Sequence, residues 1–221
     1  MKIYNPTQPN IAFNDSFYNP NEKLNKLSYR FNYIILYLLL AIFFSCNRDK
    51  AFVEKGVEKE KIGKKAEALH LYTQAYKINP ENSEANERLG FLLSESQFST
   101  IPAIYHLENA RNIDTENLKI ALKLIDLTLF IGDFNKSKRI QREVLPSVNE
   151  AIYSYIVNIT TCLEMKEIKD KKKITESLNP DFPKEIFFLS RSLSLCYETS
   201  GNYTAAEMIA SKAKEALKTY P

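Results

Sequence analysis

Several residue types are scarce in this chain, and each scarcity limits what the protein can do. Among its 221 residues there is no tryptophan, and there are only five glycines and two histidines. So few glycines leave little material for phosphate-binding loops, and neither G-x-x-x-x-G-K-[ST] nor G-x-G-x-x-G occurs. The G-x-S-x-G motif of hydrolases is also missing. The sequence therefore gives no sign of a nucleotide-binding loop or of a serine nucleophile.

The two histidines do not belong to a metal-binding pattern. No H-E-x-x-H motif surrounds His70 or His106, and no third ligand lies at a useful spacing. We expect both side chains on the outer face of the fold, without a metal. The sequence predicts no catalytic residue, no metal and no cofactor, and it predicts that the chain is not an enzyme.

What is present is the composition of a globular protein. Hydrophobic residues make up 44% and charged residues 26% of the chain, and the net charge is +3. Of this charge, +2 lies in residues 1–46, because four basic residues stand there against two acidic ones. The remainder is too close to neutral to draw the chain onto nucleic acid. The run Lys171-Lys172-Lys173 is interpreted as a solvated helix face rather than a phosphate-binding patch.

The N-terminal region is typical of an export signal. Residues 1–22 are rich in Asn and Pro without apolar periodicity, which predicts a disordered tail. Three basic residues then precede the apolar run Tyr33–Phe44. As a helix this run would span about 18 Å, whereas a bilayer core needs about 30 Å. A short apolar run behind positive charge predicts a signal peptide over residues 23–46, and a single-pass signal-anchor from Phe31 to Cys46 is the alternative.

The end of the apolar run resembles the lipobox of bacterial lipoproteins, in which an apolar segment and a small residue precede a cysteine. Here Ser45 is the small residue and Cys46 is the cysteine, while Phe43 stands where lipoboxes usually carry leucine. The resemblance implies that Cys46 is lipidated and becomes the mature N-terminus, anchored through several acyl chains. It also implies a place in the bacterial cell envelope, facing the periplasm or at the surface. In the other interpretation, Cys46 is an ordinary cysteine beside a signal or an anchor.

Glycines recur along the rest of the chain with a fixed spacing. Gly63, Gly132 and Gly201 are 69 residues apart in each step, which is twice 34 plus one, and Gly56 and Gly90 are 34 apart. A period of 34 residues is that of the tetratricopeptide repeat (TPR), in which each unit is a helix-turn-helix hairpin. The sequence resembles this family.

The residues around these glycines carry the resemblance. The family pattern has an aromatic, Leu-Gly, an aromatic, a turn Gly, then small and large apolar residues and a closing Pro. The matching positions are Phe52, Gly56, Gly63, Ala68, Tyr72, Ala75 and Pro80 in the first unit, Leu89, Gly90, Ala103, Leu107 and Ala110 in the second, Leu124, Gly132, Phe134, Ser137 and Val144 in the third, and Leu193, Ser194, Tyr197, Gly201, Tyr203, Ala206 and Ala213 in the last. Small residues permit close helix crossings, larger ones are expected to fill the gap against the next hairpin, and a turn glycine tolerates a positive φ.

The resemblance implies an all-α fold, a right-handed α-solenoid of about five TPR-like helix-turn-helix hairpins. This repeat domain is predicted over residues 47–221, with units at about 49–82, 83–117, 118–151, 152–185 and 186–221. The fourth unit is degenerate. Ile152–Met165 is typical of an apolar helix, but Pro180 and Pro183 predict a short or irregular second helix after it.

Two cysteines fall on equivalent places of this repeat. Cys162 and Cys196 stand 34 residues apart, on the expected first helices of neighbouring units. Packed helix axes lie about 8–10 Å apart, whereas a disulfide needs Cα atoms within about 7 Å. The sequence therefore favours two core thiols over a bridge.

The resemblance also implies a binding surface, because such solenoids present a concave groove lined by their first helices. The groove positions carried over from the family are Val53, Val57, Glu87, Phe91, Lys119, Leu122, Asp126, Phe130, Val157 and Leu195. Lys119 and Lys123 match the basic part of a carboxylate clamp, but Val53 and Val57 stand where that clamp needs Lys and Asn. We expect the groove to take an amphipathic helix or an extended peptide, with Phe91 and Phe130 as the main contacts.

The predicted function is that of a membrane-tethered scaffold or adaptor, which binds a protein or peptide partner within a cell-envelope assembly and does not bind nucleic acid. The alternative is a structural spacer or assembly subunit that acts through its ends. It would self-associate through the last hairpin, since the chain stops at Pro221 without a capping helix. Loss of partner capture on changing the groove would favour the first interpretation, and loss only on changing the last helix would favour the second.

Overall fold

The structure, a computed structural model, describes residues 48–178 and 183–216, and within these ranges it contains helices and no strand. The α-helices are α2 (Arg48–Lys61), α3 (Lys65–Ile78), α4 (Ser83–Leu93), α5 (Thr100–Ile113), α6 (Leu118–Phe130), α7 (Phe134–Val144), α8 (Glu150–Glu164), α9 (Ile168–Ser177), α10 (Ser190–Thr199) and α11 (Tyr203–Ala216), and the 3₁₀ segments are η1 (Gln97–Ser99), η2 (Leu145–Ser147) and η3 (Lys184–Leu189). All of them belong to the unit Asn47–Pro221. The predicted tail, the predicted signal peptide and Cys46 lie outside the described residues.

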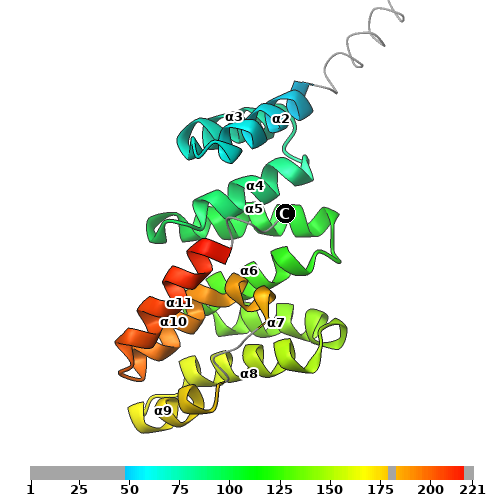
Figure 1. The fold of residues 1–221 in the computed structure, drawn as a ribbon. Helices are drawn as coiled ribbons and strands as arrows, with labels where there is room; N and C mark the ends of the chain where they lie inside the picture. Colours follow the sequence, from blue (N-terminus) through cyan, green and yellow to red (C-terminus); the bar gives the residue numbers. More distant parts are fainter. Residues whose placement is uncertain (1–47, 179–182, 217–221) are drawn as a thin grey trace, which may run out of the picture. The chain divides into compact units, whose positions relative to one another are not determined.

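Consecutive helices pack in pairs: α2 with α3, α4 with α5, α6 with α7, α8 with α9, and α10 with α11 (Figure 1). Each new pair also packs on the one before it, for example α4 on α3 and α6 on α5. The prediction of an all-α, TPR-like solenoid of about five hairpins is therefore confirmed.

Glycine ends the first helix of three hairpins. Gly63, Gly132 and Gly201 have φ values of 76°, 78° and 88°, in the left-handed region that side chains with a Cβ rarely adopt. This conformation turns the chain from the first helix into the second, as the 69-residue spacing predicted. The starts of first helices have a recurring signal as well, since Asn82, Asn117 and Asn149 each accept a hydrogen bond from the amide three residues later.

Two other glycines mark where the helices of a hairpin cross. A Cβ on Gly56 would lie 2.4 Å from the Tyr72 ring, and one on Gly90 would lie 2.4 Å from Leu107 Cγ. Tyr72 and Leu107 therefore fill the space over the glycine of their own hairpin. They also share a core cluster with residues of the next hairpin, Tyr72 with Ala85 and Leu89 and Leu107 with Ile120 and Leu124, as expected.

The Gly90 crossing gives a direct test of this register. Gly90→Leu should lower the free energy of unfolding by about 1–3 kcal/mol, because the new side chain meets Leu107 and the Ala103 carbonyl oxygen. Ala51→Leu on the exposed face of α2 adds the same side chain to open space and is the matched control. Urea denaturation followed by circular dichroism measures both; equal stability of the two variants would show that the register is wrong.

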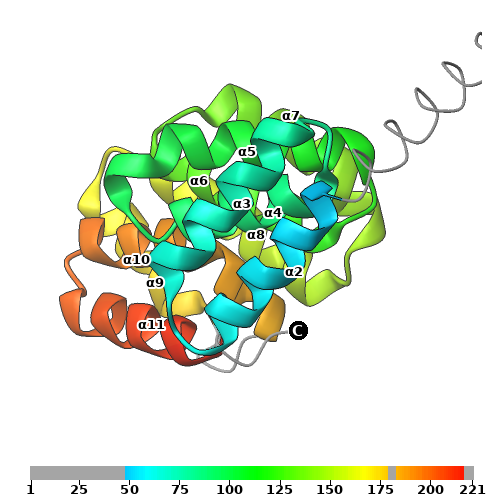
Figure 2. The ribbon, with the colours of Figure 1, turned by 90° about the horizontal axis from the view of Figure 1, so that it is seen from above.

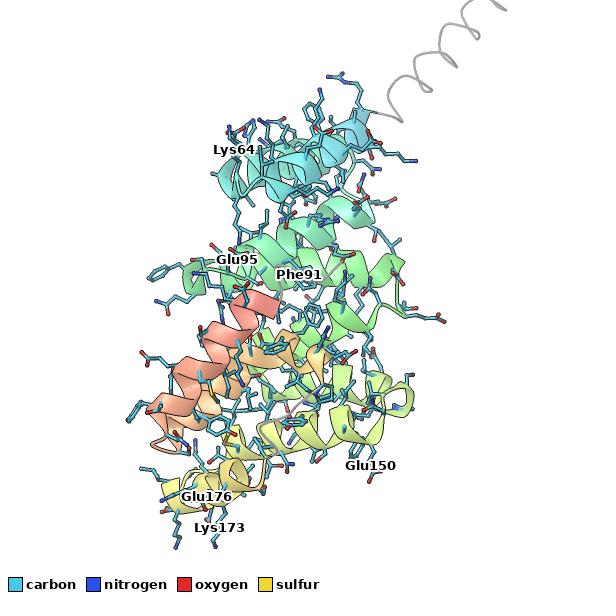
Figure 3. All side chains as sticks on the ribbon, in the orientation of Figure 1. Lys64, Phe91, Glu95, Glu150, Lys173 and Glu176 are labelled. Atoms are coloured by element: carbon cyan, nitrogen blue, oxygen red, sulfur yellow. A yellow bond between two sulfur atoms is a disulfide. The ribbon has the colours of Figure 1, made fainter. Side chains whose placement is uncertain are left out.

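The second helix of the fourth hairpin is short, as predicted. Its second helix, α9, covers Ile168–Ser177. Lys172 and Lys173 on this helix are exposed, and Figure 3 shows Lys173 and Glu176 extending outward from it. Lys171 differs from the expected solvated face, because it is buried and donates to Thr199 Oγ1 at 3.2 Å.

The last hairpin packs on both helices of the fourth, α8 and α9, but it also reaches the third. Both η3 and α10 pack on α6, and α11 packs on η3. Figures 1 and 2 both show α10 and α11 beside the α6–α8 layer. As a result α6 is buried without interruption from Ile120 to Leu129. One apolar core thus runs from α5 to α11 and includes Ile186, Phe188 and Leu189 of η3.

Candidate protein-interaction surface

The ten predicted groove residues lie on the first helices of the hairpins, but they differ in exposure. Val53, Leu122 and Asp126 are buried, and the last two have no exposed surface at all. The partly exposed ones are Val57, Glu87, Phe91, Lys119, Phe130, Val157 and Leu195. The C-terminal hairpin covers Leu122 and Asp126 on α6. Val53 is buried because it packs in the core of the first two hairpins.

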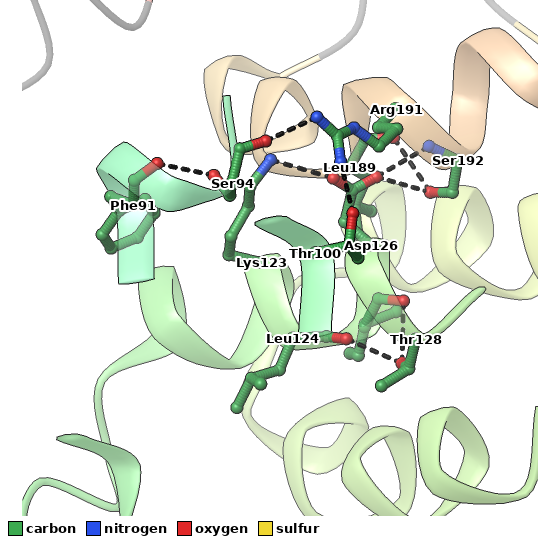
Figure 4. Close-up of polar contacts among 11 residues, drawn as sticks. Phe91, Ser94, Thr100, Lys123, Leu124, Asp126, Thr128, Leu189, Arg191 and Ser192 are labelled. Carbon is green, nitrogen blue, oxygen red and sulfur yellow. Dashed lines mark hydrogen bonds and ion pairs between the residues drawn. The ribbon is translucent and has the colours of Figure 1, made fainter. Parts of the chain in front are cut away.

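Asp126 joins α6 to the start of α10. One carboxylate oxygen accepts hydrogen bonds from the Ser192 amide at 2.7 Å and from Ser192 Oγ at 2.9 Å (Figure 4). The other oxygen pairs with Lys123 Nζ at 2.9 Å. The amides of the first turn of a helix have no partner inside the helix, and the N-cap residue of α10, Leu189, provides no side-chain bond. Asp126 therefore caps α10 from another helix, where its charge also suits the positive end of the helix dipole.

Arg191 on α10 contacts the C-terminal end of α4. Its guanidinium donates to the carbonyl oxygen of Ser94, the C-cap residue of α4, and to Thr100 Oγ1 at 3.1 Å (Figure 4). Unpaired carbonyls at a helix C-terminus attract cations. The same guanidinium lies 4.8 Å from the centre of the Phe130 ring, a cation–π distance. A carboxylate thus faces the start of α10, and an arginine faces the end of α4.

An aromatic pair completes this contact. The Phe91 and Phe188 rings are 5.8 Å apart at an angle of 58°, and Figure 3 places Phe91 on α4 beside the C-terminal hairpin. We call the groove positions Leu122, Asp126 and Phe130 the closed stretch, and the segment Phe188–Ser192 that covers them the junction. The expectation that Val53, Leu122 and Asp126 offer exposed surface to a partner was wrong. The junction buries Leu122 and Asp126, and Val53 packs in the core of the first two hairpins.

The lysines considered for a carboxylate clamp both have acidic partners. Lys119 Nζ lies 3.3 Å from Glu87, and Lys123 is buried against Asp126. This arrangement agrees with the expectation that the groove is not a carboxylate clamp.

The groove remains more open at the first two hairpins. We call Val57 and Glu87, which are both partly exposed, the open stretch. A cavity of about 450 Å³ lies between the starts of α2 and α4, and the buried Val53 forms part of its wall together with Lys50, Glu54 and others. The open stretch therefore combines an apolar side chain with a charged one.

Cys162 and Cys196 form a disulfide, which corrects our expectation of two thiols. Their Cα atoms are 5.9 Å apart, and the bond joins α8 to α10. The expectation failed because the distance between helix axes is larger than the distance between Cα atoms on the facing sides of two helices.

The histidines occupy different environments. His70 is exposed as expected, whereas His106 is half-buried between hairpins, with Nδ1 2.9 Å from Asn86 Oδ1. Burial lowers the pKa of His106. Across residues 48–178 and 183–216, no group of three His, Cys, Asp or Glu side chains is placed to hold a metal ion.

Comparisons with known proteins add little to this geometry. No family model and no curated protein matches the sequence. Among solved structures, one titled "Crystal structure of MamA protein" is similar, with 21% identity over 77% of this chain and 92% of that chain, and a TM-score of 0.48. Since a TM-score below 0.5 does not establish a common fold, the TPR-like assignment rests on the hairpins, turns and crossings described above.

The residues of the junction were not found from the sequence, although α6 carried a partial signal for them. Seven of its ten positions from Ile120 to Leu129 are apolar, and the exceptions are Lys123, Asp126 and Thr128. So wide an apolar surface needs more cover than the narrow stripe of an amphipathic helix. Lys123 and Asp126 lie on the groove face, however, so the sequence did not indicate that this face is buried as well.

Proposed function

We propose that this chain is a membrane-tethered, TPR-like scaffold of the bacterial cell envelope, which holds a protein partner in the open stretch of its groove and catalyses no reaction. The observation that carries the proposal is that the groove is covered along part of its length and exposed along the rest. The junction covers the groove at α6, and it contacts α4 through Phe188 and Arg191. Val57 on α2 and Glu87 on α4 remain partly exposed.

The partner suited to this stretch is an amphipathic helix or an extended peptide. Val57 on α2 is partly exposed and provides an apolar contact, while Val53, one helical turn before it, lies in the core. The Glu87–Lys119 pair lies on the next two first helices and provides charges beside that contact. Side chains of this kind bind a segment that carries apolar anchors on one face.

The cysteine distribution supports export. Disulfides persist in oxidising compartments such as the periplasm and are rare in the cytosol. The chain has three cysteines; two of them form the bridge, and the third is Cys46 in the lipobox-like sequence. In the part of the chain that the structure describes, no helix is long and apolar enough to cross a bilayer.

The alternative function, a spacer that acts through its ends, has less support. An end-to-end assembly needs a last hairpin whose face continues the stack. In this chain α10 and η3 pack on α6 and α8, so the last hairpin uses part of its surface for contacts with the third and fourth hairpins.

The open stretch can be tested by cross-linking. A photoreactive side chain at Val57 should give a discrete adduct with one envelope protein in intact cells, whereas the same side chain at Ile62, in the exposed turn after α2, should not. The exchange Glu87→Lys with Lys119→Glu keeps the ion pair while reversing its charges, so it should weaken the adduct and leave the melting temperature unchanged. Identical adducts from both positions would disprove the proposed site.

The anchor has its own test. Intact mass of the purified protein should show an N-terminus at Cys46 carrying acyl groups, and Cys46→Ala should give an uncleaved or unacylated chain. Cys162→Ser, which removes a different cysteine, should keep the acylated N-terminus. A wild-type N-terminus at any other residue would overturn the lipoprotein assignment.

A further inference from the structure

We propose that the partner of the open stretch is an integral membrane protein, and that the segment bound there lies directly outside one of its membrane spans. This inference rests on the proposed function, since it requires the acylated Cys46, and it adds the kind of partner. It follows from the short stretch of chain that joins the anchor to the open stretch.

The anchor has almost no tether. Helix α2 begins at Arg48, only two residues after Cys46. Two residues span at most about 7 Å, even when the chain is fully extended. A folded domain on so short a connection stays beside the bilayer that holds the acyl chains.

The start of α2 is also fastened to the rest of the domain. Asp49 is 3% exposed, and its Oδ2 accepts hydrogen bonds from Asn79 Nδ2 at 2.9 Å and from Asn82 Nδ2 at 2.8 Å. Asn79 is the C-cap residue of α3, and Asn82 is the N-cap residue of α4. Hydrogen bonds to a carboxylate are stronger than those between neutral groups. The first turn of α2 is therefore held in place, and the tether cannot lengthen by fraying of this helix.

These limits place the open stretch close to the membrane. Val57 lies nine residues after Arg48, which is a rise of about 14 Å along α2. With the tether added, Val57 lies within about 20 Å of Cys46 in any orientation of the domain. A distance of about 20 Å corresponds to roughly 13 residues of helix or six residues of extended chain. A partner segment that contacts Val57 therefore lies within that reach of the bilayer.

The distribution of charge favours the same orientation. Residues 48–65, which form α2 and the turn after it, contain seven basic and four acidic residues. Residues 66–221 contain 19 basic and 21 acidic ones, so the basic end of the domain is the end next to the anchor. Anionic lipid headgroups attract basic residues that stand close to the membrane surface.

The small size of the open stretch favours a partner in the same membrane. It offers one apolar side chain, Val57, and the Glu87 carboxylate with Lys119 beside it. A handful of large, well-buried contacts usually dominate the affinity of an interface, so this site alone gives modest affinity. Confinement of both proteins to one bilayer raises their effective concentration without any new contact.

The test extends the photo-cross-linking at Val57 by mapping the adduct in intact cells. The adduct should contain an integral membrane protein, linked at a residue within about 13 positions of a membrane span. Insertion of twenty Gly and Ser residues between Asn47 and Arg48 adds a flexible coil of about 25 Å. Because effective concentration falls steeply with tether length, the adduct yield should drop by about tenfold. The same twenty residues appended after Pro221 leave the tether unchanged and should leave the yield as in the wild type.

A soluble protein or a second copy of this chain in the adduct would overturn the inference, and so would a linked residue far from any membrane span. An undiminished yield from the acylated chain with the inserted linker would overturn it as well. In each of these cases the open stretch remains a binding site, so the proposed function can stand when this inference fails. Absence of any discrete adduct at Val57 would contradict the proposed function itself, and absence of acyl groups on Cys46 would remove the anchor; this inference falls with either.

Discussion

Asp126→Ala is expected to lower the free energy of unfolding by about 3–5 kcal/mol, the usual cost of removing one partner from a buried ion pair. Lys123 is 6% exposed, so its ammonium group would remain inside the protein without a counter-charge. The Ser192 amide would lose its acceptor at the same time, and α10 would begin without a cap. Urea denaturation monitored by circular dichroism measures the loss.

A double substitution distinguishes this cause from simple loss of packing. Lys123→Met with Asp126→Leu removes both charges and keeps most of the volume, so it should cost clearly less than Asp126→Ala alone. Asp126→Asn retains an acceptor for Ser192 and should fall between the wild type and Asp126→Ala. If the double variant were less stable than the single one, the ion pair would not be the source of the effect.

Loss of the disulfide should have an effect of similar size. Cys162 and Cys196 are separated by 34 residues, and closing a loop of that length stabilises a protein by about 3–4 kcal/mol, chiefly by restricting the unfolded chain. Treatment with a dithiol reductant in moderate urea should therefore lower the unfolding midpoint of the wild-type protein.

The double variant Cys162→Ala with Cys196→Ala provides the control. It should unfold at about the midpoint of the reduced wild type and should not respond to the reductant. An oxidised wild type in which both cysteines react with an alkylating reagent under native conditions would contradict the bridge.

The parts of the fold that follow from local geometry could be predicted from the sequence. Gly63, Gly132 and Gly201 identify turns because a positive φ is strained for other residues, and the structure has them at φ values of 76–88°. Gly56 and Gly90 identify helix crossings because no Cβ fits there. These positions, together with the 34-residue period, were sufficient for the helical pairs, and Pro180 and Pro183 were sufficient for the short α9.

The packing of the last hairpin on α6 could not be predicted in the same way. A repeat pattern describes how each hairpin packs on its neighbour, but the contact between Asp126 and Ser192 joins the third hairpin to the fifth. The third and fifth hairpins come together because small rotations between successive hairpins add up, and no single residue determines these rotations. The groove residues were therefore assigned to the correct helices, whereas their exposure at α6 was not foreseen.

The cap that α6 provides for α10 has a consequence for how this protein folds. Most repeat arrays behave as one-dimensional chains, in which terminal units can melt or be removed one at a time. Here the start of α10 depends on a carboxylate 66 residues earlier, and Arg191 and Phe188 contact α4 as well, so hairpins two to five should gain and lose structure as one cooperative block. Contacts between distant parts of a chain slow folding, because the loop between them must close first. The second hairpin must therefore wait for the C-terminal residues before its packing is complete.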